Sequence, residues 1–321
     1  MRIIWIGLML LTLPVFAASQ SSGSLSSPSL GFVYERETGI VRPLLGIAGS
    51  ATVGAPVDVG LPLTNAISLS DQHSILAVPE SGPFLLSIDL GVTPPVTRSI
   101  IGAAKSADIT MSPNGNTAAL AYRGGQLVEV VTGLPEHPAV TLGITTTLIN
   151  APLRRVVVND AGNLLLMTFL ENDRETVYRW NRTEGFRLLA STAAVGTLGF
   201  VGPSAAVFAD SGTNELYFAP DVKTGSVTQF LAGASDGVAG PIGVAASGTG
   251  GFVIANSSSG TIISFGANRR VLGTQQCDCS VSGLHPVSTG IFRLTEKLNQ
   301  TIYLLDTATT EPRLLFVPPL Q

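Results

Sequence analysis

Charged side chains are scarce in this sequence: Asp, Glu, Lys and Arg make up 12% of its 321 residues, about half the usual share. The 18 basic and 22 acidic residues leave a net charge of −4. Nucleic-acid-binding proteins need a basic surface, and long coiled coils need Ala, Glu, Lys and Arg in quantity. The sequence therefore predicts neither class and no nucleic-acid partner. Disorder is excluded as well, because hydrophobic residues reach 45%.

Histidine is also scarce, with only His73, His137 and His285 in the chain. Each follows or precedes a turn signal, and none lies near another His, Cys or carboxylate at the spacing of metal ligands. We therefore expect solvated turn residues, no metal site and no cofactor. Residues distant in sequence could still converge in the fold, so a site assembled from several segments stays open.

The two cysteines, Cys277 and Cys279, are separated by one residue. Alignment with the repeats described below places both in one innermost strand. Residues i and i+2 of an extended strand lie roughly 6.5–7 Å apart, at or beyond the range that a disulfide spans. Three interpretations stay open: two small buried side chains, a strained disulfide, and a metal or redox site.

Long hydrophobic runs are absent except at the N-terminus. Residues 1–18, MRIIWIGLMLLTLPVFAA, combine one positive charge, an apolar run and small residues at the end, which is typical of a cleaved signal peptide. Residues 19–29 are rich in Ser and are predicted to form a flexible mature N-terminus. We therefore expect a secreted or periplasmic protein with no transmembrane segment after cleavage.

What the sequence has in quantity is turn formers, 35 Gly and 20 Pro, and they recur with a period. Short apolar runs that end in a turn begin 42, 47, 42, 46 and 33 residues apart, at residues 67–71, 109–113, 156–160, 198–202, 244–248 and, with a poorer match, 277–281. After most of these runs, three further strand-like segments follow, separated by hairpin signals such as Asn-Gly. Four strands per unit of 40–45 residues predict the blade of a β-propeller.

The number of blades follows from the length. Six units begin between residues 67 and 277, and segments 30–35 and 40–45 look like the last two strands of a further, incomplete blade. Seven blades give about 43 residues per blade, which fits the observed spacing better than the six-bladed alternative. The sequence thus predicts an all-β fold, with residues 30–321 forming a single propeller domain, since blades cannot bury their faces alone.

Two stretches carry a resemblance to a known family. Residues 252–265, FVIANSSSGTIISF, resemble the strand–Asn–turn–strand repeat of secreted YVTN/NHL-type propellers, which are WD40-like, and residues 109–120 resemble the opening segment of that repeat. As a pattern, the resemblance extends over about residues 30–318. It implies a propeller fold and, since most such propellers are binding scaffolds and a minority are enzymes, it implies less about activity.

A ligand site in a propeller is expected around the axis, where the innermost strands begin. The residues before the aligned starts include Asp108, Arg155 and Gln276, which we select as candidate ligand-binding residues of an axial rim. No catalytic residues can be named. We expect an exported, monomeric, non-catalytic binding scaffold for an unknown protein or small-molecule ligand. The alternative is an esterase- or lactonase-like hydrolase with an axial site.

Overall fold

A computed structural model describes residues 28–81, 85–92, 94–100, 107–122, 126–298, 300–309 and 311–319, apart from the side chain of residue 107. The predicted signal peptide, residues 1–18, lies outside the described residues, as does the Ser-rich segment 19–29 up to residue 27. No helix among the described residues is long and apolar enough to cross a membrane.

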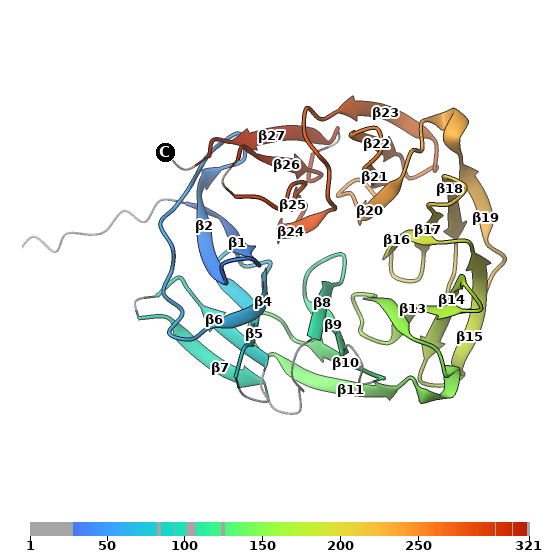
Figure 1. Cartoon of the computed structure of the whole chain (residues 1–321), viewed down its shortest axis with the longest axis horizontal. Helices are drawn as coiled ribbons and strands as arrows, with labels where there is room; N and C mark the ends of the chain where they lie inside the picture. The colour runs from blue at the N-terminus through green and yellow to red at the C-terminus, as the bar shows by residue number, and fades with distance from the viewer. Residues whose placement is uncertain are drawn as a thin grey trace, which may run out of the picture.

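Seven antiparallel sheets surround a central axis and form a seven-bladed β-propeller (Figure 1). The first sheet consists of β1 (Ser29–Glu35), β2 (Ile40–Ile47) and β3 (Ser50–Val53). The second consists of β4 (Leu63–Ser68), β5 (Ser74–Pro79), β6 (Leu85–Asp89) and β7 (Val96–Ile100). The third consists of β8 (Ala107–Met111), β9 (Thr117–Tyr122), β10 (Leu127–Thr132) and β11 (Ala139–Thr145). The seven-bladed prediction is confirmed.

The remaining sheets repeat the four-stranded order. Their strands are β12 (Leu153–Val158), β13 (Leu164–Glu171), β14 (Arg174–Asn181) and β15 (Gly185–Thr192); β16 (Val195–Phe200), β17 (Ala206–Asp210), β18 (Glu215–Ala219) and β19 (Gln229–Ala232); β20 (Pro241–Ala246), β21 (Phe252–Asn256), β22 (Thr261–Phe265) and β23 (Val271–Gln276); β24 (His285–Ser288), β25 (Ile291–Arg293), β26 (Ile302–Asp306) and β27 (Arg313–Val317). Two single-turn 3-10 helices, η1 (Thr147–Ile149) and η2 (Ala234–Asp236), are the helical segments of the described chain.

The hydrophobic core is divided into clusters between the blades. The second strand of several blades is buried along its whole length, as in β5, β17 and β21, because both of its faces contact a neighbouring sheet. One cluster, for example, joins Leu69 and Leu76 of the second blade to Leu120 of the third. Blades of this kind cannot be stable alone, which is why the chain forms a closed ring.

The turns after the innermost strands connect neighbouring blades by hydrogen bonds. The Asn114 backbone N–H donates to the Asp160 carboxylate over 2.9 Å, and the Asn159 side chain donates to the Pro203 carbonyl over 2.9 Å. Gly115 and Gly162 complete two of these turns with positive φ angles of 76° and 69°, which glycine adopts without strain. The Asn-Gly signal at Gly115 and the Asp-x-Gly signal at Gly162 therefore form hairpin turns, and the same turns make the contacts between neighbouring blades.

The first blade differs from the other six in the direction of β1, the strand of its sheet that lies nearest the axis. In the middle of β1 the Phe32 N–H donates to the hydroxyl of Ser68, the last residue of β4, and nearer the C-terminal end of β1 the Tyr34 hydroxyl donates to the carbonyl of Leu63, the first residue of β4. β1 is therefore antiparallel to β4 and corresponds to the second strand of a regular blade. Among the described residues, no strand fills the innermost position of this blade.

Two sequence expectations need correction. The incomplete blade contains three strands, not two, because β3 follows β2 through a tight turn with glycines at positive φ. Five of the six aligned starts lie in innermost strands, but residues 277–281 lie in the connection that precedes β24. β24 has only four residues, one of them Pro286, so its sequence lacks the apolar run that marks the other starts.

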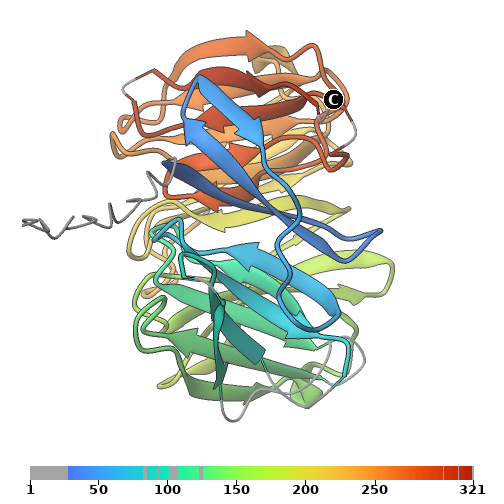
Figure 2. The same ribbon diagram turned by 90° about the vertical axis from the view of Figure 1, so that its left-hand side faces the viewer.

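The ring closes by packing between separate sheets. Neighbouring blades in the chain are neighbours in the ring, and the first blade lies between the last and the second (Figure 2). Gly31 of β1 approaches both neighbours so closely that a Cβ atom there would overlap the Val287 carbonyl oxygen and the Ser68 side chain. Leu30 and Val33 share a buried cluster with Val287 of β24.

Candidate functional site

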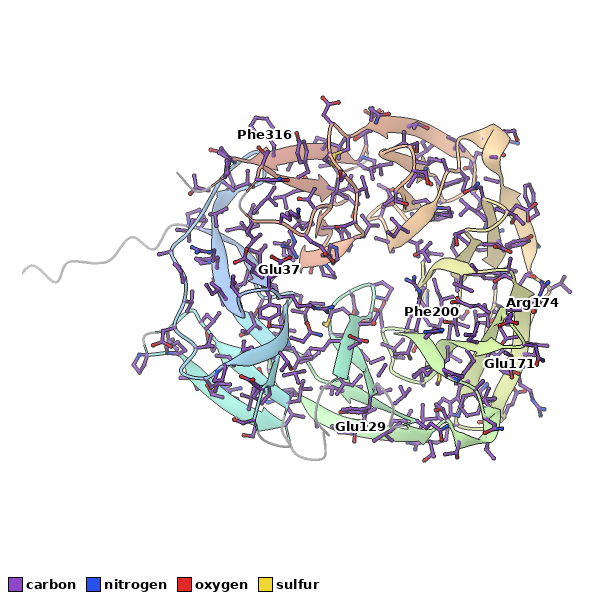
Figure 3. All side chains as sticks on the ribbon, in the orientation of Figure 1. Glu37, Glu129, Glu171, Arg174, Phe200 and Phe316 are labelled. Atoms are coloured by element: carbon purple, nitrogen blue, oxygen red, sulfur yellow. A yellow bond between two sulfur atoms is a disulfide. The ribbon has the colours of Figure 1, made fainter. Side chains whose placement is uncertain are left out.

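An axial cavity of about 1200 Å³ lies where the seven blades meet. Each blade contributes to its wall through the strand that lies nearest the axis, with apolar or small side chains such as Phe32, Ile67, Ile109, Val157, Leu198, Val244 and Val287. Figure 3 shows two lining residues, Glu37 and Phe200, on opposite sides of the axis. The cavity is large enough for a small-molecule ligand.

Charge is distributed unevenly around this cavity. The ionisable residues that line it are Glu35, Arg36, Glu37, Asp108, Asp278, His285, Arg293, Glu296 and Lys297. All except Asp108 come from the end of β1 and the turn that follows it, or from residues 278–297, which lead into the last blade and form its first two strands. The polar end of the cavity is therefore the junction between the first and last blades.

His285 and Arg293 form the centre of this polar end. They are cross-strand partners in β24 and β25, so their side chains extend from the same face of the sheet. The His285 Nε2 atom lies 3.4 Å from the Ser282 hydroxyl and 3.9 Å from the Glu296 carboxylate. Burial lowers the pKa of His285, Arg293 acts in the same direction and Glu296 opposes the shift, so that the pKa is about 4. The imidazole is therefore neutral at pH 7.

Arg293 is a buried cation, with 8% of its surface exposed. Its guanidinium donates one side-chain hydrogen bond, of 3.0 Å, to the Glu296 backbone carbonyl, and none of the ion pairs found among the described residues includes it. Burial lowers the pKa of Arg293, and the charges of Glu296 and Glu35 act in the opposite direction. These two carboxylates therefore balance the charge at a distance without binding the guanidinium.

The three rim residues selected from the sequence do not come together. Asp108 lines the cavity. Arg155 is solvent-exposed and is not part of the cavity wall. Gln276 ends β23, the outermost strand of its blade, and its side chain donates to the carbonyls of residues 259, 260 and 277. Gln276 was selected because it precedes the run 277–281, which we expected to lie in an innermost strand. That expectation was wrong, since the run lies in the connection before β24.

Cys277 and Cys279 are joined in a disulfide, which is one of the three interpretations that the sequence left open. Their Cα atoms lie 5.1 Å apart, within disulfide range, because the segment is a bent connection and not an extended strand. Cys277 is buried beside Val281 and Leu294, whereas Cys279 lines the cavity. The disulfide therefore shapes the segment that leads into the last blade.

The histidines divide into two groups. His73 and His137 are exposed in connections between strands, as expected, but His285 belongs to an innermost strand and lines the cavity. Neither His285 nor Arg293 carried a signal in the sequence, because their position depends on the pairing of two very short strands. Within the part of the chain that the structure describes, no group of three or more His, Cys, Asp or Glu residues is placed to hold a metal ion.

Comparison with known proteins supports the fold alone. No protein-family model and no curated protein matches this chain. Among solved structures, a functionally unknown protein from Desulfotomaculum acetoxidans DSM 771 is 11% identical, with a TM-score of 0.57, over 90% of this chain and 100% of the other. The Kuenenia stuttgartiensis hydrazine synthase structure is 10% identical, with a TM-score of 0.55, over 92% and 98%.

A third similar structure is that of a catalytically inactive variant of virginiamycin B lyase from Staphylococcus aureus with quinupristin. It is 12% identical, with a TM-score of 0.54, over 79% of this chain and 83% of the lyase. At such identities the similarity extends to the propeller architecture and not to the chemistry of a site.

Proposed function

We propose that this protein is an exported propeller of the YVTN/NHL type that binds a ligand in its axial cavity without catalysing a reaction. The observation that carries the proposal is the cavity of about 1200 Å³ to which all seven blades contribute. A closed ring of sheets holds these residues on rigid strands, which favours binding because little order is lost when the ligand enters.

The arrangement around His285 favours binding over hydrolysis. In a serine hydrolase the acid orients the histidine through one ring nitrogen while the serine contacts the other. Here Ser282 and Glu296 both approach the same atom, Nε2 of His285, and the Ser282 hydroxyl donates to the Leu294 carbonyl. This geometry gives no specific support to the esterase or lactonase alternative.

Two features support export. The N-terminal sequence has the pattern of a cleaved signal peptide, and a disulfide such as Cys277–Cys279 is favoured in oxidising compartments. Cleavage would leave a mature chain beginning close to residue 19, which mass spectrometry of the exported protein measures. A monomer is expected in size-exclusion chromatography with light scattering.

Obstruction of the cavity tests the binding function. Ser280 is exposed and lines the cavity, so Ser280→Trp narrows the opening without removing a buried contact. The control is Thr274→Trp, which adds the same side chain to an exposed position of the outermost strand β23 in the preceding blade. Ligands are first found by NMR screening of a small-molecule library against the wild type. We expect their affinity to fall at least about tenfold in Ser280→Trp and to stay unchanged in Thr274→Trp.

The same variants test the hydrolase alternative. Wild-type protein is incubated with a panel of esters and lactones, with and without calcium, and no turnover is expected. Turnover that disappears in Ser280→Trp and persists in Thr274→Trp would overturn the non-catalytic proposal. Equal ligand binding by both variants would instead contradict the assignment of the cavity as the binding site.

A further inference from the structure

The incomplete first blade leaves a polar recess at one end of the axial cavity. Val287 extends from β24 toward the first blade and packs with Leu30 and Val33. Ile291 of β25 belongs to the same buried cluster. Because side chains alternate along the regularly paired β25, Arg293, two residues later, lies on the same face as Ile291, and so does its cross-strand partner His285. The recess between the last and first blades is thus lined by a neutral imidazole and a buried guanidinium.

The chain contains a second buried arginine that shows how a guanidinium is normally accommodated. Arg179 has 9% of its surface exposed, and it donates to the Glu184 carboxylate over 2.6 Å and to the Lys223 carbonyl over 2.9 Å. Arg293 is equally buried but donates only to a backbone carbonyl. A buried charge without a bound counter-ion is costly, so the unused donors of Arg293 require an explanation.

We propose that the Arg293 guanidinium binds the carboxylate of a small-molecule ligand in the axial cavity. This inference rests on the proposed binding function and names the chemistry of its ligand. The forked N–H groups of a guanidinium match the two oxygens of a carboxylate, and Arg293 both lines the cavity and lacks a carboxylate partner within the described residues.

Among anionic ligands, the other charges in the cavity wall favour a single negative charge over two. Five carboxylates and three cations line the cavity: Glu35, Glu37, Asp108, Asp278 and Glu296 against Arg36, Arg293 and Lys297. This excess of acidic groups repels a dianion such as phosphate more strongly than a monoanion. Glu35 and Glu296 are near enough to influence the pKa of Arg293, yet neither is in ion-pair contact with it, which leaves the fork accessible to a monocarboxylate.

A matched set of probes with one carbon skeleton tests this assignment. The probes are 3-phenylpropionate, 3-phenylpropylamine and 3-phenylpropionamide, titrated into the folded wild-type protein at pH 7 with ligand-observed NMR. We expect the carboxylate to bind at least about tenfold more tightly than the amine or the amide, which is the contribution of one charge-assisted hydrogen bond. The tenfold preference should disappear in Arg293→Gln.

The controls separate the role of Arg293 from a general effect of charge. Arg269→Gln removes an exposed cation that stacks on Phe218 outside the cavity wall, and it should leave the preference unchanged. If Arg293→Gln does not fold, Arg293→Lys replaces it: the charge remains but the fork is lost, so the preference should fall without disappearing.

The outcomes distinguish this inference from the proposed function. The three probes could bind to the wild type with equal affinity and all lose binding in Ser280→Trp. That result would overturn the carboxylate inference and leave the proposal of binding in the cavity intact. An undiminished carboxylate preference in either Arg293 variant would overturn the inference as well. If no probe binds to the wild type, the carboxylate inference is wrong, while ligands from the library screen still test the cavity itself.

Discussion

Two junctions between blades differ in how far their contact extends. Between the fifth and sixth blades, Gly196 approaches the Pro241 carbonyl so closely that a Cβ would overlap it, and Gly199 contacts Val244 further along the same strands. Between the last and first blades, Gly31 makes an equally close approach to Val287. Beyond that point, however, the wall is lined by His285 and Arg293 instead of packed apolar side chains.

The difference follows from which strands the two blades contribute to each junction. β16 and β20 are regular innermost strands that pack along their length. At the other junction β1 has the direction of a second strand, and the innermost position of its blade is unfilled in the described structure. In the described part of the chain, this unfilled position thus accompanies a tight contact at one end of the junction and a polar recess at the other, so the least regular junction provides the most functional chemistry.

The tight end of the junction between the last and first blades gives the largest predicted effect. Gly31→Ala introduces a Cβ at a φ of +131° that would overlap the Val287 carbonyl oxygen and the Ser68 side chain. We expect the free energy of unfolding, measured by denaturant titration, to fall by about 3 kcal/mol. The control is Gly185→Ala, with a φ of +67° and no atom within 4 Å of the added carbon, which should cost about 1 kcal/mol. Similar losses of unfolding free energy in the two variants would show that the close approach of Gly31 to Val287 and Ser68 does not hold the ring together.

The two buried arginines give a second prediction, of opposite effects on stability. Arg179→Gln removes hydrogen bonds to Glu184 and to the Lys223 carbonyl, and the loss of the carbonyl bond alone costs about 1 kcal/mol. Arg293→Gln removes a buried charge without a bound counter-ion, so we expect unchanged or increased stability. Thermal and denaturant unfolding of both variants measures the difference. A larger loss for Arg293→Gln would mean that Arg293 has a structural role.

The pH dependence of the recess gives the smallest predicted effect. Since the pKa of His285 is about 4 in the folded protein and about 6.5 in an unfolded chain, the unfolded state binds more protons between these values. The contribution of His285 to the free energy of unfolding is therefore fully present above pH 6.5, and it is lost as the pH decreases toward 4. With 35% of the side chain exposed, screening limits the loss to about 1 kcal/mol.

Variants at two histidines test this assignment. His285→Gln should reduce the slope of unfolding free energy against pH between 6.5 and 4. His73→Gln, in the exposed turn after β4, should leave that slope unchanged. Identical curves for wild type and His285→Gln would contradict the assignment.

The fold could be predicted from the sequence because its signals are local and repeated. The segment 40–45 is predicted as a strand and lies within β2, since apolar residues between turn signals can pair only with their neighbours in a hairpin. The site could not be predicted in this way. Asp108 was found because it directly precedes the clear apolar run of β8, whereas His285 and Arg293 belong to strands of four and three residues, too short to show a period.

By itself, then, the sequence determined the all-β class, the repeated hairpins and the number of blades, because turn chemistry and the alternation of apolar runs act over a few residues. Only the tertiary structure decided which strand of the first blade lies nearest the axis, and with it the position of the recess. That outcome depends on how the last and first blades pack when the ring closes, and contacts between residues such as Gly31 and Val287, more than 250 positions apart, leave no mark in a local pattern.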